Sequence, residues 1–137
     1  MYTTALDLVK EILADEELNE CCKELTGKNL TTFTSGPRLN TPAAVIEFGD
    51  AEIRGKRENT VFHVVYNITF VMSFFGSDGF EKCHLFLDNF IKVALNYESE
   101  KDDKKVYVIR VDPTMVEKDP EKDWWGITVR IVVGCLD

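Results

Sequence analysis

One long alternating run, Val61 to Phe75, constrains the fold of this chain more than any other stretch. Successive side chains of a β-strand point to opposite faces, so residues two apart share a face. The run is also longer than the roughly 3–10 residues usual for a strand, and we expect it to reach beyond its own domain. One face is wholly apolar, which predicts burial in the core, and consists of Phe62, Val64, Tyr66, Ile68, Phe70, Met72 and Phe74.

The opposite face of this strand mixes apolar and polar side chains. Val65, Val71 and Phe75 share it with residues such as His63 and Asn67. A face of this kind suits neither a closed core nor a fully solvated surface. We therefore predict that Val65, Val71 and Phe75 contact a neighbouring subunit.

Amphipathic helices are predicted on both sides of the long strand. Apolar residues recur at helical spacing from Ala5 to Leu13. Asp15 can cap a second short helix that Gly27 closes in a left-handed conformation, and one kinked helix is the alternative. A further helix is predicted from about Phe80 to Leu95, because its apolar residues again follow the helical period.

Shorter strands are predicted beside the long one, because their residues are β-branched or aromatic or alternate in polarity. The strand that begins at Ala43 is expected to end at Gly49-Asp50, and a charged hairpin connection, residues 51–60, then leads into the long strand. Residues 98–105 are predicted to be a solvated loop, and so are residues 112–123, which hold two prolines. The shorter strands are predicted at residues 29–33, 43–48, 106–111 and 125–135.

These elements predict one α+β domain that spans residues 1–137. Their order, α-β-β-β-α-β-β, suggests a mainly antiparallel sheet of four to five strands with two main helices packed on one face. A chain of 137 residues, 45% of them hydrophobic, can bury such a core on its own.

The chain is acidic, with 16 Lys and Arg against 24 Asp and Glu and a net charge of -8. This sign opposes binding to a phosphate backbone, so we expect no nucleic-acid sequence recognition. No apolar run approaches the about 20 residues of a membrane helix, and the first residues do not resemble a secretion signal. We expect a cytosolic chain without membrane contact, its four cysteines reduced.

No residue pattern indicates catalysis, and we expect a protein that is not an enzyme and binds neither cofactor nor metal. Cys83 and His84 are adjacent on a predicted helix and diverge by about 100°, so they cannot easily serve one substrate as nucleophile and base. Cys21 and Cys22 point to different sides of a helix, which is unlike the spacing of zinc ligands.

Arg54, Lys56 and Arg57 form a compact basic cluster on this acidic chain. Its simplest interpretation is a solvated hairpin tip, and its functional interpretation is contact with an acidic surface of a neighbouring copy. Trp124 and Trp125 begin the last strand on opposite faces. One of them is predicted to lie in the core and the other to be available to a partner.

The order of these segments resembles that of the tail terminator and tail completion proteins of long-tailed phages and prophages. The similarity covers most of the chain, but the adjacent cysteines and the charged stretches at 98–105 and 117–123 depart from the family. It rests on the opening helix with Ala14-Asp15-Glu16-Glu17-Leu18, the entry Thr41-Pro42-Ala43-Ala44-Val45-Ile46 into a strand, the long strand with its following helix, and the closing Gly126-Ile127-Thr128-Val129-Arg130-Ile131.

The resemblance implies small α+β subunits that assemble into a ring, commonly a hexamer, which caps the tail tube and helps to join it to the head. The implied partners are further copies of the chain, the tail tube protein and head-tail connector proteins. The implied location is the virion tail, after assembly in the host cytoplasm. The connection 51–60 is then expected to lie between subunits or to face the lumen.

Two other classes of function stay open at this point. An acidic monomer could bind one basic partner, as an inhibitor or immunity-type protein does, and the net charge of -8 favours this. A small enzyme or ligand-binding domain would need a deep pocket that holds His63 or several carboxylates.

Overall fold

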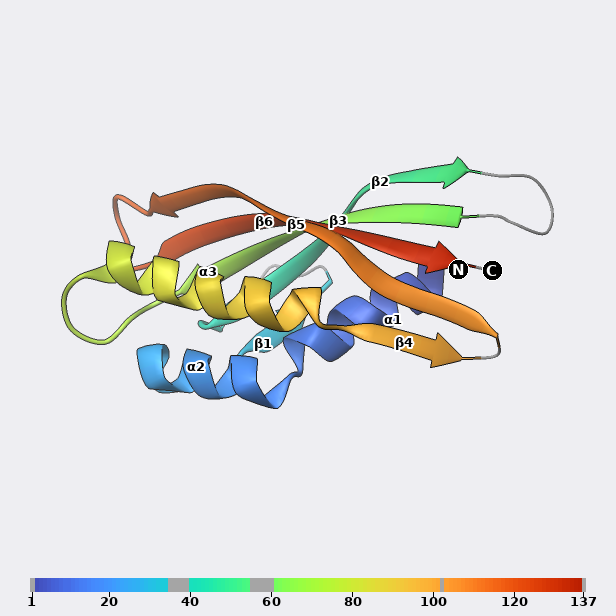
Figure 1. The fold of residues 1–137 in the computed structure, drawn as a ribbon. Helices are drawn as coiled ribbons and strands as arrows, with labels where there is room; N and C mark the ends of the chain where they lie inside the picture. The colour runs from blue at the N-terminus through green and yellow to red at the C-terminus, as the bar shows by residue number, and fades with distance from the viewer. Residues whose placement is uncertain (1, 35–39, 55–60, 102, 137) are drawn as a thin grey trace.

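Two helices begin the fold and are separated at Asp15 (Figure 1). The computed structural model describes residues 2–34, 40–54, 61–101 and 103–136, and its first elements are α1 (Tyr2–Leu13) and α2 (Glu16–Thr26). Asp15 caps α2, because its Oδ2 accepts the backbone N–H of Leu18 at 3.1 Å. Gly27 ends α2 in the left-handed conformation with φ of 86°. The predicted second helix is therefore confirmed, and the alternative of one kinked helix is wrong.

The described strands form one six-stranded sheet in the order β1-β2-β3-β6-β5-β4. Neighbouring strands are antiparallel, except that β1 runs parallel to β2. The third helix, α3 (Gly79–Leu95), connects β3 to β4. The strands are β1 (Thr31–Phe33), β2 (Ala43–Arg54), β3 (Val61–Met72), β4 (Glu98–Lys101), β5 (Lys104–Lys118) and β6 (Trp125–Leu136).

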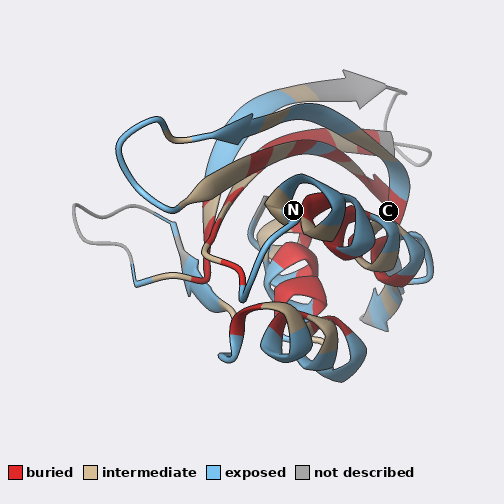
Figure 2. Ribbon diagram, turned by 90° about the vertical axis from the view of Figure 1, so that its left-hand side faces the viewer, coloured by how far each residue is buried: buried red, intermediate tan, exposed pale blue. Residues whose placement is uncertain are grey.

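All helices in the described part lie on one face of the sheet, which arches over them (Figures 1 and 2). Figure 2 shows the buried residues gathered where helices and sheet face one another. The predicted core face of β3 is confirmed, since all seven of its residues are buried. Phe70 lies at its centre and packs edge-on against Phe86 and Phe90, with ring centroids 4.9 and 5.1 Å apart.

The predicted fold class, α+β with a mainly antiparallel sheet, is confirmed, but the predicted counts are wrong. The described part has six strands and three helices in the order α-α-β-β-β-α-β-β-β. The additional strand, β4, lies within residues 98–105, which were expected to be a loop. Charged residues such as Glu98 and Glu100 are suited to an edge strand, where charge discourages pairing with another chain.

The prediction of a loop over residues 112–123 is also wrong at its start, because β5 continues to Lys118. Pro113 is tolerated inside this strand for two reasons. The register of β5 shifts between Pro113 and Met115, and β4 pairs only with residues 104–107 of β5. Pro113 therefore lies next to a register irregularity and beyond the part of β5 that pairs with β4, where proline is tolerated in a strand.

The predicted end of a strand at Gly49-Asp50 is wrong as well, since β2 runs on to Arg54. The register against β3 shifts between Phe48 and Asp50, so Gly49 is the extra residue of a β-bulge. β3 itself is shorter than its alternating run, because it ends at Met72, although Phe74 beyond it is still buried.

Candidate subunit interface

The sheet face opposite the helices is the open face of the molecule, and two of the predicted contact residues lie on it. Val71 is half-buried there, whereas Val65 is 8% exposed. Val65 is covered because the bulge brings Gly49 against it: a Cβ added to Gly49 would lie 3.2 Å from a Val65 methyl group. A partner on the open face can therefore reach Val71 more easily than Val65.

Phe75 lies elsewhere, although the alternation pattern assigned it to the same face. Its backbone N–H donates to the carbonyl of Leu25 at 3.0 Å, and its ring lies over Gly27 at the end of α2. The ring is still 60% exposed. The structure thus brings Val65 and Val71 to one face and separates Phe75 from them, because the strand ends before Phe75.

The basic cluster falls mostly outside the described residues. Arg54 is the last residue of β2, and Lys56 and Arg57 belong to the stretch that the structure does not describe. Their predicted role in a subunit contact stays a prediction.

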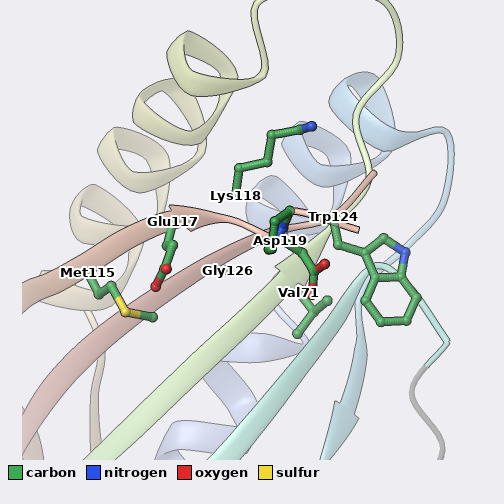
Figure 3. Close-up of a pocket in the computed structure, with 8 residues that line it drawn as sticks. Val71, Met115, Glu117, Lys118, Asp119, Trp124 and Gly126 are labelled. Atoms are coloured by element: carbon green, nitrogen blue, oxygen red, sulfur yellow. The ribbon is translucent and has the colours of Figure 1, made fainter. Parts of the chain in front are cut away.

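A hollow of about 380 Å³ opens on the open face, at the end of the sheet where β3 and β5 finish and β6 begins (Figure 3). Its apolar part comes from side chains of three different segments, and carboxylates stand beside them. The lining residues are Val71, Met115, Glu117, Lys118, Asp119, Pro120, Trp124 and Gly126.

Gly126 lines this hollow, and the fold does not require a glycine at this position. A Cβ added at Gly126 would meet no atom closer than the Glu117 carbonyl oxygen, at 3.8 Å. At Gly134 in the same strand, by contrast, a Cβ would come within 2.8 Å of Ile109. A strand glycine that is free of such crowding suits a site where another chain approaches the backbone closely.

The loop from Asp119 to Trp124 forms one wall of the hollow and is held by its own hydrogen bonds. The Asp119 N–H donates to the Trp124 carbonyl at 2.9 Å. The Asp119 carboxylate accepts the backbone N–H groups of Glu121 and Lys122 at 2.8 and 3.0 Å, and these bonds lower the pKa of Asp119. Asp119 is therefore anionic at neutral pH.

Charge and apolar surface are arranged unevenly around the hollow. Figure 3 shows Glu117 on the same side of β5 as Met115, and the Lys118 side chain pointing the other way. Lys122 places its Nζ 4.3 Å from the ring centroid of Trp124, a cation–π contact that holds the indole. The hollow thus combines apolar side chains with the carboxylates of Glu117 and Asp119.

The two tryptophans face different surroundings, as predicted. Trp124 lines the hollow, whereas Trp125 packs against the core on the side of α3, with its ring 6.1 Å from that of Phe80. Trp125 is thus the predicted core tryptophan, although both side chains are half-buried.

The cysteines and histidines do not gather into a site in the described part of the chain. Cys83 is fully buried, and burial raises its pKa to about 11. His84 is exposed, with its Nδ1 2.8 Å from the Phe80 carbonyl oxygen. As predicted, the two do not face one target. Within the described residues, no group of three or more His, Cys, Asp or Glu side chains could hold a metal ion.

Sequence reasoning missed most of the hollow. Met115, Glu117 and Lys118 were assigned to a loop, and Gly126 was noted only within a strand pattern. The alternation of Met115 with Glu117 next to a tryptophan pair and a glycine is the pattern that could have indicated a lined surface.

Among the described residues, no helix has the length and apolar character needed to cross a membrane.

Comparisons with known proteins bear on the fold. No protein-family model matches the sequence, and no match is found among curated proteins. Among solved structures, the chain is similar to a chain of the "Virion of native gene transfer agent (GTA) particle", with a TM-score of 0.57 and 8% sequence identity. The similarity covers 95% of this chain and 92% of that one. At this identity the similarity shows a shared fold.

Proposed function

We propose that this chain is a non-enzymatic structural subunit of a phage-type virion, which assembles into a ring that terminates the tail tube and joins it to the head. The observation that carries the proposal is the fold shared with a chain of a gene transfer agent virion over nearly the full length of both. The order of segments in the sequence, which resembles that of tail terminator and tail completion proteins, is a second support for the proposal.

The shape of the molecule supports self-assembly. One sheet face is covered by helices, whereas the other carries a hollow lined by apolar side chains together with Glu117, Asp119 and Lys118, and no element covers it among the described residues. Its partners in this proposal are further copies of itself in a ring, commonly a hexamer, together with the tail tube protein and head-tail connector proteins. The ring forms in the host cytoplasm and ends in the virion tail.

Light scattering after size-exclusion chromatography, with negative-stain microscopy of the same fractions, tests the proposal. We expect a ring with a mass that is a multiple of the 15.7 kDa subunit. A monomer that persists at high protein concentration contradicts it.

The acidic-inhibitor alternative makes the opposite prediction in the same experiment. An inhibitor of net charge -8 stays monomeric and captures one basic protein, and the capture weakens as salt is added. A ring that resists added salt and a salt-sensitive one-to-one complex are therefore separable outcomes.

A further inference from the structure

An exposed aromatic ring stands on the helix side of the sheet, at the end of the molecule where β3 finishes. Phe75 follows β3, and its ring is 60% exposed although it lies over Gly27 at the end of α2. The backbone of Phe75 is held by the hydrogen bond that its N–H donates to the Leu25 carbonyl at 3.0 Å. An exposed phenyl ring on a fixed backbone is suited to the core of a protein interface, where aromatic side chains are enriched.

Two lysines accompany this ring. The Lys82 Nζ donates a hydrogen bond to the Phe75 carbonyl oxygen, which holds the ammonium group beside the Phe75 backbone. Lys28, the second residue after α2, is exposed. Within the described residues neither lysine forms an ion pair, not even with Glu24 or Asp78, the carboxylates close to them in sequence. Phe75, Lys28 and Lys82 together form what we call the Phe75 knob.

The hollow over Gly126 carries the opposite charge. Glu117 is exposed beside Met115, and its carboxylate has neither an ion pair nor a hydrogen bond within the described residues. Asp119 adds a second carboxylate, and Lys118 points away from Glu117 (Figure 3). An apolar hollow with carboxylates complements an apolar ring with ammonium groups, and such complementarity selects partner and orientation in an interface.

The knob and the hollow lie on opposite sides of the sheet. The Phe75 ring lies against the end of α2, which belongs to the helix layer, whereas the hollow lies on the open face. Figure 1 shows α2 and the connection from β3 to α3 on one side of the sheet and the end of β5 on the other. Because the sheet separates the two features within one subunit, a contact between them joins two copies.

We infer that the Phe75 knob of one copy docks into the hollow over Gly126 of a second copy. The inference rests on the proposed function and names the contact that builds the assembly. Because the two surfaces differ, the contact is head-to-tail, with the helix layer of one copy against the open sheet face of the next. Its repetition gives a closed ring or an open chain. The absent side chain at Gly126 leaves room for the incoming ring.

Truncation of the ring and filling of the hollow form the first test. Phe75→Ala removes the anchor and Gly126→Leu occupies the space that it enters, so each is expected to weaken self-association by about tenfold or more. The double variant is expected to associate no more weakly than the weaker single one, since both changes remove the same contact. Sedimentation velocity over a range of concentrations measures the association.

Leu95→Ala is the control for this test. It removes another apolar side chain, 50% exposed at the far end of α3, and is expected to associate like the wild type. Circular dichroism and the thermal midpoint confirm the fold of each variant. Unchanged association of folded Phe75→Ala and Gly126→Leu chains overturns the inference.

Charge exchange identifies the two surfaces of the contact. Glu117→Lys and the double variant Lys28→Glu/Lys82→Glu are each expected to lose self-association, because like charges then meet in every contact. An equal mixture of the two regains it, because each knob again meets a hollow of opposite charge. Recovery on mixing also shows that both variants are folded. Lys10→Glu, on the exposed surface of α1, is the matched control and is expected to associate normally.

The outcomes separate this inference from the proposed function. Rings that persist in both charge variants overturn the docking contact and leave the ring intact. Folded variants that stay apart on mixing overturn the pairing of knob and hollow. Recovery on mixing with open chains and no rings supports the docking contact and contradicts ring termination. A wild-type chain that stays monomeric overturns both.

Carbodiimide cross-linking of mixed isotope-labelled copies adds a direct readout. The expected product joins Lys28 or Lys82 of one copy to Glu117 or Asp119 of another. Cross-links between copies that join these carboxylates only to other lysines overturn the inference.

Discussion

Tyr97 donates a hydrogen bond from its Oη to Oδ1 of Asp15 at 2.7 Å, across 82 positions of the sequence. The other oxygen of the same carboxylate caps α2 through the Leu18 N–H. One carboxylate thus ties the junction of α1 and α2 to the segment that leads from α3 into β4.

Tyr97→Phe is expected to lower the free energy of unfolding by about 1–2 kcal/mol, because a hydrogen bond to a charged acceptor is lost while Asp15 still caps α2. Urea unfolding measures the difference. Tyr107→Phe is the matched control, since Tyr107 is also half-buried and no hydrogen bond of its hydroxyl is described. Equal losses in the two variants would contradict the role of this bond.

The same contact gives a pH dependence at the alkaline end. Burial, and then the hydrogen bond to Asp15 and the nearby charges of Asp15 and Glu11, raise the pKa of Tyr97 from 10.0 to about 12. Because the folded chain holds this proton more tightly, the stabilisation is complete below the unfolded pKa and is lost as pH rises through the folded one. Tyrosinate absorbance is expected to show a component that titrates at about pH 12, and Tyr97→Phe is expected to reduce this component. An unchanged titration curve contradicts the assignment.

Gly27→Ala is expected to destabilise the fold by about 1 kcal/mol or more. Gly27 has φ of 86°, and an added Cβ would lie 2.4 Å from the Phe75 ring. The double variant Gly27→Ala/Phe75→Ala removes the clash and keeps the backbone strain, so thermal unfolding of both separates the two causes. Gly126→Ala, without crowding or positive φ, is the control and is expected to be neutral or stabilising.

Phe70→Ala is expected to cost about 3–5 kcal/mol, because Phe70 is fully buried between Phe86 and Phe90 and its loss leaves a cavity. Phe80→Ala, at a ring that is 58% exposed, is expected to cost under about 1 kcal/mol. Chemical denaturation of both variants measures the contrast. Comparable losses of unfolding free energy in the two variants would contradict the central position of Phe70 in the core.

Alkylation of the native protein is expected to modify Cys21 before the other three cysteines, but more slowly than an ordinary exposed cysteine. Cys21 is partly exposed, whereas Cys22, Cys83 and Cys135 are buried. Partial burial and the carboxylates of Glu24 and Glu17 raise the pKa of Cys21, which lowers the fraction of reactive thiolate. Mass spectrometry of peptides after timed labelling gives the order, and early labelling of Cys83 would contradict the buried core. Unfolding is expected to equalise the four.

Periodicity predicted β3 and its core face because only one arrangement buries Phe62 through Phe74 together. It failed at the edges, where side chains need not be apolar. The residues of β4, Glu98–Lys101, are all polar, so no alternation of polarity marks them as a strand. Pro113 suggested a loop, but proline is tolerated in an outer strand beside a bulge. Gly49-Asp50 was predicted to end a strand because glycine is common where strands end, but glycine is also common at a bulge inside a strand.

The hollow could not be predicted because its walls come from three segments. Val71, Met115 and Gly126 are brought together by strand order and register, and these depend on contacts between residues far apart in the sequence. The basic cluster needed no fold to be recognised, since three cations within four positions stand out on an acidic chain.

The pairing of β3 with β6 also governs when the chain can fold during its synthesis. Met72 pairs with Trp125 and Val61 with Leu136, so the centre of the sheet closes only after β6 has left the ribosome. Until then the apolar face of β3 lacks its main partner strand and is exposed to wrong contacts. The centre of the sheet therefore forms only once β6 is available, and chaperones that shield β3 until then would raise the yield of folded chains.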